Sequence, residues 1–242
     1  MKPDFKLSIV NLKYDEFSNI AKDIRLQEDT LHIWEVNLDS QNNQSSLIKN
    51  LSLDEQHKAE QFYFNLHRQR FITCRGILRI LLGNYLEIEP NKIRLFYGEH
   101  GKPSVEESRD SKKLQFNVSH SQGLALLAFM WNHQVGIDIE YIRPISSLEH
   151  LTKRFFFTKE HNVIHSLPLE QRYKTFWQYW TCKEACLKAT GTGLFALNQV
   201  EIELSDEKHP KLLRALNSLN PNHWILQSLT LDHNHIGAFV VG

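Results

Sequence analysis

The chain has 242 residues, of which 41% are apolar and 23% are charged, a composition typical of a globular protein with a full hydrophobic core. Lys plus Arg and Asp plus Glu both number 28, so no net charge favours bulk binding to nucleic acid or to a membrane surface. No apolar run approaches the roughly 20 residues of a membrane span, the first residues lack the layout of a signal peptide, and three cysteines do not make a disulfide framework. We therefore expect a reduced, cytoplasmic protein with no nucleic-acid or membrane partner.

The first half of the chain predicts two strands and two helices. Ser52 precedes the first helix, and Glu55 occupies the position that completes a capping box. The predicted elements are a strand at 31–38, a helix at 53–63, a helix at 68–85 and a strand at 93–97. The segments expected to be loops are the polar run 39–46 and the turn 98–103, and the charged run 104–113 is expected to be exposed.

The second half predicts a strand-rich segment, then helices, then strands again. Gly191 closes the last helix. The predicted elements are strands at 114–119, 124–131 and 135–140, helices at 145–157, 158–167 and 170–189, and strands at 199–204, 224–231 and 235–241. Strands with interspersed helices and hairpins favour an α+β fold over a doubly wound parallel sheet.

The two long helices carry a short internal repeat. Residues 71–75 match residues 179–183 in character, and the same offset aligns Gly83 with Gly191. Each half also has a strand–helix–strand order. We therefore expect two pseudo-symmetric α/β halves, residues 1–112 and 113–242, with a ligand cleft between them.

The predicted strand 135–140 combines an apolar face with two acids. Its valine and isoleucines fall on one face, and Asp138 and Glu140 fall on the other, about 7 Å apart. Carboxylates beside a core are costly unless they are paired or bound to a cation. The strand alone leaves two alternatives open, a solvated outer face and a platform for a divalent metal.

The helix at 170–189 has a face on which Trp177, Trp180, Glu184 and Lys188 recur at three- and four-residue spacing. Glu184 and Lys188 also fit an ordinary i,i+4 ion pair. If this face packs against the acidic strand, three carboxylates converge, and their repulsion favours a bound cation. Carboxylate oxygens without thiolate or imidazole favour Mg²⁺, which commonly shares its ligands with substrate phosphates. The pattern therefore points to a phosphate-bearing substrate.

Basic residues near this segment are candidates for binding such phosphates. Lys102 lies in a restrained turn between Gly101 and Pro103, whereas some of the others also fit ordinary surface charges. The candidates are Lys58, Arg70, Arg75, Arg79 and Lys102.

The hydroxyl–imidazole–hydroxyl sequence Ser119-His120-Ser121 ends a predicted buried strand. A covalent Ser–His dyad is not expected there, because adjacent residues of a strand point to opposite faces. Two further patterns are set aside. His161 and His165 have the spacing of a zinc-protease helix but lack its glutamate, and the Gly191–Gly193 pattern follows a helix where a dinucleotide motif would follow a strand.

In their order and spacing, five motifs resemble the 4′-phosphopantetheinyl transferases, specifically the long surfactin-type (Sfp-type) members. The resemblance extends from about residue 53 to 241. The motifs are Gly101-Lys102-Pro103, Phe116-Asn117-Val118-Ser119-His120-Ser121, Val135-Gly136-Ile137-Asp138-Ile139-Glu140, Trp180-x-x-Lys183-Glu184-Ala185-x-Leu187-Lys188 and Gly191-x-Gly193.

The resemblance implies an Mg²⁺-dependent enzyme that transfers phosphopantetheine from coenzyme A to a serine of an acyl or peptidyl carrier protein. Coenzyme A would lie between the halves, with its 3′-phosphate and adenine on the N-terminal half. The implied metal ligands are Asp138, Glu140 and Glu184, and the implied catalytic residues are Glu184, Lys188 and His120. The implied coenzyme A contacts are Lys58, Arg70, Lys102, Pro103, Ser119, His120 and Lys188.

One departure from the family pattern is Glu55, because some members have a second lysine at that position.

The two halves would already form the cleft, so we expect a monomer. Two other classes of function compete with this prediction: a module that binds coenzyme A or a nucleotide without catalysis, and a plain α+β interaction protein. The full set of Asp138, Glu140, Glu184 and Lys188 argues against a pure binding module.

Overall fold

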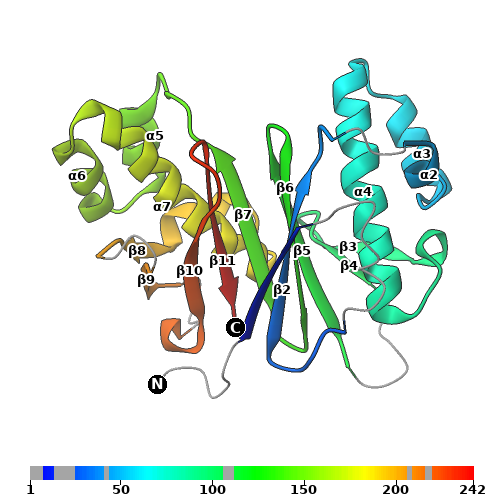
Figure 1. Cartoon of the computed structure of the whole chain (residues 1–242). Helices are drawn as coiled ribbons and strands as arrows, with labels where there is room; N and C mark the ends of the chain where they lie inside the picture. The colour runs from blue at the N-terminus through cyan, green and yellow to red at the C-terminus, as the bar shows by residue number, and fades with distance from the viewer. Residues whose placement is uncertain (1–7, 14–24, 41–43, 106–111, 206–208, 216–219) are drawn as a thin grey trace.

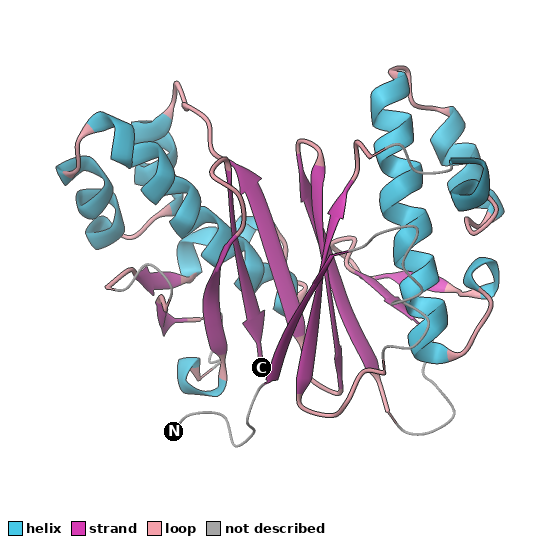
Figure 2. Ribbon diagram, viewed as in Figure 1, coloured by secondary structure: helices cyan, strands magenta, loops and turns pink. Residues whose placement is uncertain are grey.

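Two β-sheets form the centre of the molecule in the computed structural model (Figures 1 and 2). The structure describes residues 8–13, 25–40, 44–105, 112–205, 209–215 and 220–242. The first sheet has the order β1 (Ser8–Lys13), β2 (Thr30–Asn37), β6 (Leu124–Trp131) and β5 (Leu114–Ser121). The second has the order β10 (Ile225–Thr230), β11 (His235–Val241) and β7 (Val135–Tyr141). Only the β1–β2 pairing is parallel within these sheets.

Helices cover the outer side of each sheet (Figure 1). Beside the first sheet lie α2 (Gln44–Ile48), α3 (Leu53–Glu60) and α4 (Asn65–Leu86). Beside the second lie α5 (Leu148–Phe155), α6 (Thr158–Ser166) and α7 (Leu169–Thr190). The smaller elements are β3 (Leu95–Tyr97), β4 (Pro103–Val105), β8 (Glu201–Glu203), β9 (Lys211–Arg214) and the 3-10 turns Pro90–Lys92, Leu194–Gln199 and Pro221–His223.

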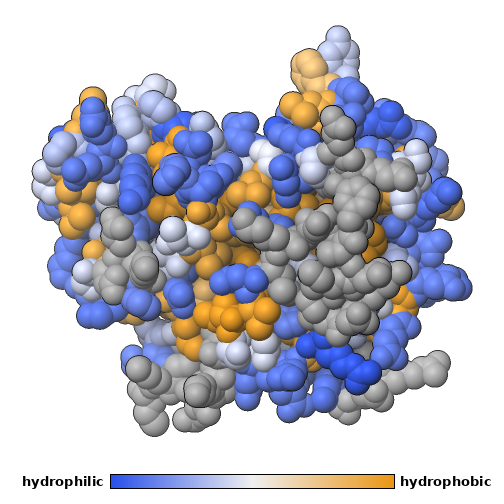
Figure 3. Space-filling view, in the orientation of Figure 1, coloured by the Kyte–Doolittle hydropathy of each residue, from blue (hydrophilic) through white to orange (hydrophobic). Residues whose placement is uncertain are grey.

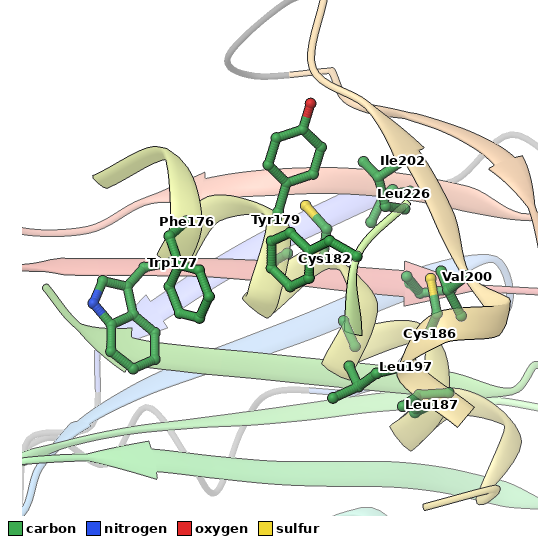
Figure 4. Packing of buried hydrophobic residues seen from close by; sticks show 14 of the residues in the cluster. Phe176, Trp177, Tyr179, Cys182, Cys186, Leu187, Leu197, Val200, Ile202 and Leu226 are labelled. Atoms are coloured by element: carbon green, nitrogen blue, oxygen red, sulfur yellow. The ribbon is translucent and has the colours of Figure 1, made fainter. Parts of the chain in front are cut away.

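Three hydrophobic clusters hold these layers together. One joins α4 to the first sheet, one lies between the two sheets, and one joins α7 to the second sheet. Figure 4 shows the α7 cluster, in which Phe176, Tyr179 and Cys182 point from the helix into the core. Strand β6 contributes alternate residues to the first two clusters, so both of its faces are buried. This burial explains why β6 is almost wholly apolar.

The surface seen in Figure 3 is mainly hydrophilic over the outer helices, with apolar residues visible between the two halves. Within the described residues, no helix is long and apolar enough to cross a membrane.

The predicted helix ends agree with local chemistry. Ser52 caps α3, because its hydroxyl accepts from the Glu55 N–H and the Glu55 carboxylate accepts from the Ser52 N–H at 3.0 Å. Gly191 ends α7 with φ +73°, a left-handed conformation that glycine adopts at little cost. Helix α6 begins at Thr158, the first residue of the helix predicted at 158–167, and its cap is Phe157, whose N–H donates to Glu160 at 2.7 Å.

Several short elements differ from the predictions. Strands β1 and β9 were not predicted, and α2 begins inside the segment 39–46 that was expected to be a loop. The expected exposed run 104–113 contains the end of β4, with Val105 buried, and its residues 106–111 lie outside the described part of the chain. By strand pairing, the two sheets divide at residues 132–134, whereas the sequence predicted a division after residue 112.

The α+β class and the two similar halves are confirmed. Helices α4 and α7 have the same length and flank the two sheets in the same way (Figure 1). Each also carries a cation that pairs with a glutamate of the preceding short helix. Arg75 lies 3.3 Å from Glu55, and Lys183 lies 2.8 Å from Glu160.

Candidate active site

Strand β7 and helix α7 pack so closely that a side chain would not fit between them at one point. A Cβ atom at Gly136 would collide with the carbonyl oxygen of Ala185 and the backbone nitrogen of Ala189. Glycine is therefore required for this approach. Because the helix backbone lies on the strand, Glu184 and Lys188 face the acidic side chains of β7.

Asp138 is the centre of this contact and is only 3% exposed. Its Oδ1 accepts a hydrogen bond from the Ser119 hydroxyl at 2.8 Å and from the Lys188 ammonium at 2.6 Å. Lys188 also donates to Ser119 Oγ at 2.9 Å. The other carboxylate oxygen, Asp138 Oδ2, is buried and has no hydrogen-bond partner among the residues that the structure describes. A buried carboxylate oxygen without a partner indicates a site built for something further.

The other two acids are Glu140, which is half-buried, and Glu184, which is buried, and both lie near the negative charge of Asp138. The Ser121 hydroxyl donates to Glu140 Oε2 at 3.0 Å, and Arg143 lies 4.0 Å from the same oxygen. Burial raises the pKa of Glu140, and the charge of Asp138 raises it further. Burial also raises the pKa of Glu184 to about 7, again with a contribution from Asp138. Glu184 therefore gains or loses its proton near neutral pH.

The three acids are not gathered at metal-ligand distances. The described residues contain no group of three or more His, Cys, Asp and Glu side chains that could hold a metal ion as they stand. Lys188 balances Asp138, and the raised pKa values of Glu140 and Glu184 reduce the remaining negative charge. The mutual repulsion of the acids is relieved in this way.

Two adjoining cavities open beside this cluster. One, of about 580 Å³, is lined by basic and aromatic side chains, among them Lys58, His67, Arg70, Phe71, Arg75 and His120. The other, of about 640 Å³, is lined by Glu184 and Lys188 together with Leu187, Leu194 and Phe195. The two cavities share Gly101, Pro103 and Val118. A bipartite ligand with an anionic end and a less polar end fits such a pair.

Comparisons with known proteins identify the family. Residues 36–132 match the family model "4′-phosphopantetheinyl transferase, N-terminal", and residues 134–240 match that of the "4′-phosphopantetheinyl transferase superfamily". The chain is 44% identical to 4′-phosphopantetheinyl transferase HetI of Nostoc sp. over 90% of each protein. This chain belongs to the 4′-phosphopantetheinyl transferase superfamily. It is also 38% identical to a putative 4′-phosphopantetheinyl transferase of Synechocystis sp., over 75% of this chain and 72% of that protein.

Membership of this superfamily makes the chain a transferase. The 4′-phosphopantetheinyl transferase Sfp of Bacillus subtilis is 29% identical to it, over 73% of this chain and 81% of Sfp. The two family models meet at residue 133, in the turn between β6 and β7 where the two sheets divide. The family's two-part division therefore coincides with the structural one.

In this transferase, most of the residues singled out from the sequence lie around the two cavities. Lys58, Arg70 and His120 line the basic cavity, and Pro103 lines both. His120 is exposed; partial desolvation lowers its pKa, and Lys188 and Arg70 lower it further.

Lys102 lines the cavity of Glu184 and Lys188, but its ammonium points at backbone carbonyl oxygens. Its Nζ donates to the carbonyl oxygens of Val135 at 3.1 Å and Ala189 at 2.8 Å. Burial lowers the pKa of Lys102 to about 8. The side chain therefore joins the start of β7 to the end of α7 at the edge of the cavity.

Three of the basic candidates are already engaged by carboxylates: Arg70 by Asp39, and Arg75 and Arg79 by Glu55. Arg70 forms a two-point pair with Asp39, with Nε–Oδ1 at 2.7 Å and Nη2–Oδ2 at 2.6 Å. Arg79 is 2% exposed, bonds Glu55, and donates to the carbonyl oxygens of Pro90 and Ile93 at 2.7 and 3.0 Å. Arg79 is therefore a structural residue and does not reach a phosphate.

Glu55, where this chain departs from the expected family pattern, also has a structural role. Glu55 is buried, completes the cap of α3, and pairs with Arg75 and Arg79 on α4. Its carboxylate anchors one helix to the other. A lysine at this position would bring a third cation against these two arginines, which would be costly to bury.

The sequence analysis placed Ser121 and Asn117 in a motif but gave neither residue a role in the site. Both side chains point from β5 toward β7 and accept its backbone N–H groups. The available signal was the alternation of polar side chains along the strand, opposite Leu114 and Phe116. Asp39 was also missed, because the only sign of its pairing is an arginine 31 positions later.

Proposed function

We propose that this enzyme transfers the 4′-phosphopantetheine group of coenzyme A to a serine hydroxyl of an acyl or peptidyl carrier protein. The serine oxygen attacks the phosphorus that bears pantetheine, the bond to the bridging oxygen breaks, and adenosine 3′,5′-bisphosphate leaves. The observation that carries this proposal is the position of Asp138, Glu184 and Lys188, which lie where a basic cavity adjoins a largely apolar one.

The two cavities match the two ends of coenzyme A. The basic cavity offers Lys58 and His67 for a phosphate and the rings of Phe62, Phe71 and Tyr97 for an adenine base. The other cavity offers Leu187, Leu194 and Phe195 for the pantetheine arm. With the ends placed in this way, the pyrophosphate lies near Lys188. The serine of the carrier must then approach through the cavity that Glu184 lines.

The acids fit a divalent cation, and we propose that Asp138, Glu140 and Glu184 hold Mg²⁺. The fit rests on hard oxygen donors and on the buried Asp138 Oδ2, which lacks a partner among the described residues. When bound, the ion would polarise the attacked phosphate and stabilise its developing charge. The pair of Lys188 with Asp138 must then open or be shared, which would release the ammonium for the substrate.

The protein groups supply the proton transfers. Glu184, with a pKa raised to about 7, is suited to accept the proton of the attacking serine near neutral pH. Lys188 neutralises or protonates the leaving bisphosphate, and His120 contacts the phosphates from the neighbouring cavity. Because phosphoryl transfer needs mainly positioning and charge neutralisation, no covalent enzyme intermediate is required.

We further propose that the enzyme acts as a monomer in the cytoplasm, without nucleic acid or membrane. The monomer is supported by the two cavities, which one chain supplies together. A reducing compartment is supported by the free cysteines Cys74, Cys182 and Cys186. The zero formal net charge supports the absence of nucleic-acid and membrane partners.

Mass spectrometry of apo carrier proteins incubated with the enzyme, coenzyme A and Mg²⁺ tests the function. We expect the mass of phosphopantetheine to be added to the carrier, and Glu184→Gln to abolish this addition without unfolding the protein. Glu170→Gln, an exposed acid on the same helix, is the matched control and should be fully active. Failure of the wild-type enzyme to modify any of a panel of fatty-acid, polyketide and peptide carriers would refute the proposal.

A further inference from the structure

Strands β5 and β7 lie side by side but belong to different sheets, and side chains join them. Asn117 Oδ1 accepts from the Ile137 N–H at 2.9 Å, Ser119 Oγ from the Ile139 N–H at 3.3 Å, and Ser121 Oγ from the Tyr141 N–H at 3.0 Å. Every second residue of β5 thus bonds every second residue of β7. Side-chain oxygens take the place that carbonyl oxygens have in an ordinary sheet.

The two serines of this row make a second hydrogen bond that the asparagine does not. Ser119 donates to Asp138 Oδ1 at 2.8 Å, and Ser121 donates to Glu140 Oε2 at 3.0 Å. A serine hydroxyl has one hydrogen to donate, so each serine directs it to a carboxylate and accepts from the next backbone N–H. The same arrangement occurs twice, two residues apart. At the Asn117 position, the corresponding residue of β7 is Gly136, which has no side chain to hold.

We propose that Ser119 and Ser121, the serine pair, are positioning residues that orient Asp138 and Glu140 for the metal ion. The inference rests on the proposed function. Each serine fixes one carboxylate oxygen and leaves the other, Asp138 Oδ2 or Glu140 Oε1, available as a ligand. Because the serines are themselves held by the backbone of β7, they fix one oxygen of each carboxylate and so set the alignment of the carboxylate on the strand. Such alignment lowers the cost of gathering acids around a cation.

The resemblance implies that Ser119 contacts coenzyme A, and its hydrogen bonds add a second role, which it shares with Ser121. Ser119 and Ser121 are both buried, whereas His120 between them is exposed toward the basic cavity. The hydroxyl hydrogen of Ser119 is directed to Asp138, and its lone pairs face Lys188 and the backbone of β7. Ser121 contacts Glu140 without contacting Lys188 in any described hydrogen bond, so it offers the cleaner test.

The test compares Ser121→Ala with Ser121→Thr, which keeps the hydroxyl. Calorimetric titration of Mg²⁺ into each enzyme–coenzyme A complex measures the metal affinity, and carrier modification at saturating Mg²⁺ measures kcat. We expect Ser121→Ala to weaken metal binding by about 10-fold, the lower end of losses for residues that hold metal ligands. At saturating Mg²⁺ its kcat should stay within about threefold of wild type, and Ser121→Thr should restore most of the affinity.

Asn117→Ala is the matched control, because it removes the same kind of bridge between β5 and β7 but leaves both carboxylates held. It should lower the melting temperature without changing the metal affinity. The proposal is overturned if Ser121→Ala binds Mg²⁺ within twofold of wild type, or if Asn117→Ala weakens binding as much. It also fails if the wild-type complex binds no Mg²⁺, which would remove the metal from the proposed function as well. If the wild-type enzyme modifies the carrier but Ser121→Ala leaves metal binding unchanged, the role of the serine pair is refuted while the proposed function stands.

Discussion

Lys183 and Glu160 form a fully buried ion pair beneath the candidate active site, and removing the lysine should destabilise the fold strongly. Lys183 is 0% exposed and Glu160 is 1% exposed. The ammonium bonds the Glu160 carboxylate at 2.8 Å and the carbonyl oxygen of Val200. The carboxylate also accepts from the N–H groups of Phe157 at 2.7 Å and Ile202 at 2.8 Å. The pair therefore joins α7 to α6 and to the start of β8.

Lys183→Met keeps the length of the side chain but leaves Glu160 buried without its cation. Breaking one partner of a buried pair costs about 3–5 kcal/mol. Glu160 retains two backbone donors, so we expect a loss near the lower end, about 3 kcal/mol in the free energy of unfolding. For a chain of this size, that loss corresponds to a fall of roughly 6–12 °C in melting temperature. Urea denaturation followed by tryptophan fluorescence measures it.

The double variant Lys183→Met with Glu160→Gln separates the unpaired charge from lost packing. It should regain part of the loss, because a neutral amide is cheaper to bury than an unpaired carboxylate. Lys159→Met, an exposed lysine on the adjacent helix α6, should leave stability within about 0.5 kcal/mol of wild type. A Lys183→Met enzyme as stable as wild type, with lost activity, would show that this lysine acts in chemistry and would refute the structural role.

Three further predictions concern charges at the site. Because the folded-state pKa of Glu184 is raised from 4.5 to about 7, the unfolded chain releases this proton at a lower pH than the folded protein does. The metal-free protein should therefore lose about 2–3 kcal/mol of stability as pH rises from 4.5 to 7. Glu184→Gln should flatten this loss in denaturation experiments with EDTA, and an unchanged slope of stability against pH would contradict the prediction. Coenzyme A affinity should fall as pH rises through about 8, where Lys102 loses its charge, and Lys102→Arg should remove this dependence in calorimetric titrations; a wild-type affinity that is flat across this range would count against Lys102. Asp39→Asn should free Arg70 and tighten coenzyme A binding about two- to fivefold, the value of an exposed ion pair. Dephospho-coenzyme A, which lacks the 3′-phosphate, should show no gain in affinity. An equal gain would contradict a contact between Arg70 and the 3′-phosphate.

Much of this site could be predicted because its signals are local. Alternation along 135–140 placed Asp138 and Glu140 on one face of a strand, and helical spacing placed Glu184 and Lys188 on one face of α7. Gly136 explains why these two faces meet, since its missing side chain allows the helix backbone to lie on the strand. The sequence could not show that the Lys188 ammonium forms an ion pair with Asp138.

The interactions that escaped prediction are those whose partners lie far apart in the chain. Glu55 was recognised as a cap from its spacing to Ser52, but its pairs with Arg75 and Arg79 depend on how α3 docks on α4. The short strands β1 and β9 carry little periodicity of their own, and they form because a neighbouring strand is present. Tertiary packing decides both cases.

The two halves share a scaffold but not a site, and the residues that break the symmetry explain why the proposed metal-binding acids lie in one half. The offset that aligns Cys74 with Cys182 places Gly76 and Ile80 of α4 opposite Glu184 and Lys188 of α7. A Cβ at Gly76 would lie 3.0 Å from the side chain of Leu47, and Ile80 packs against the core of the first half. The face of α4 that matches the catalytic face of α7 is therefore used for packing. Without such acids, the first half supplies basic and aromatic groups to one cavity, and under the proposed function the two halves would bind different ends of one substrate.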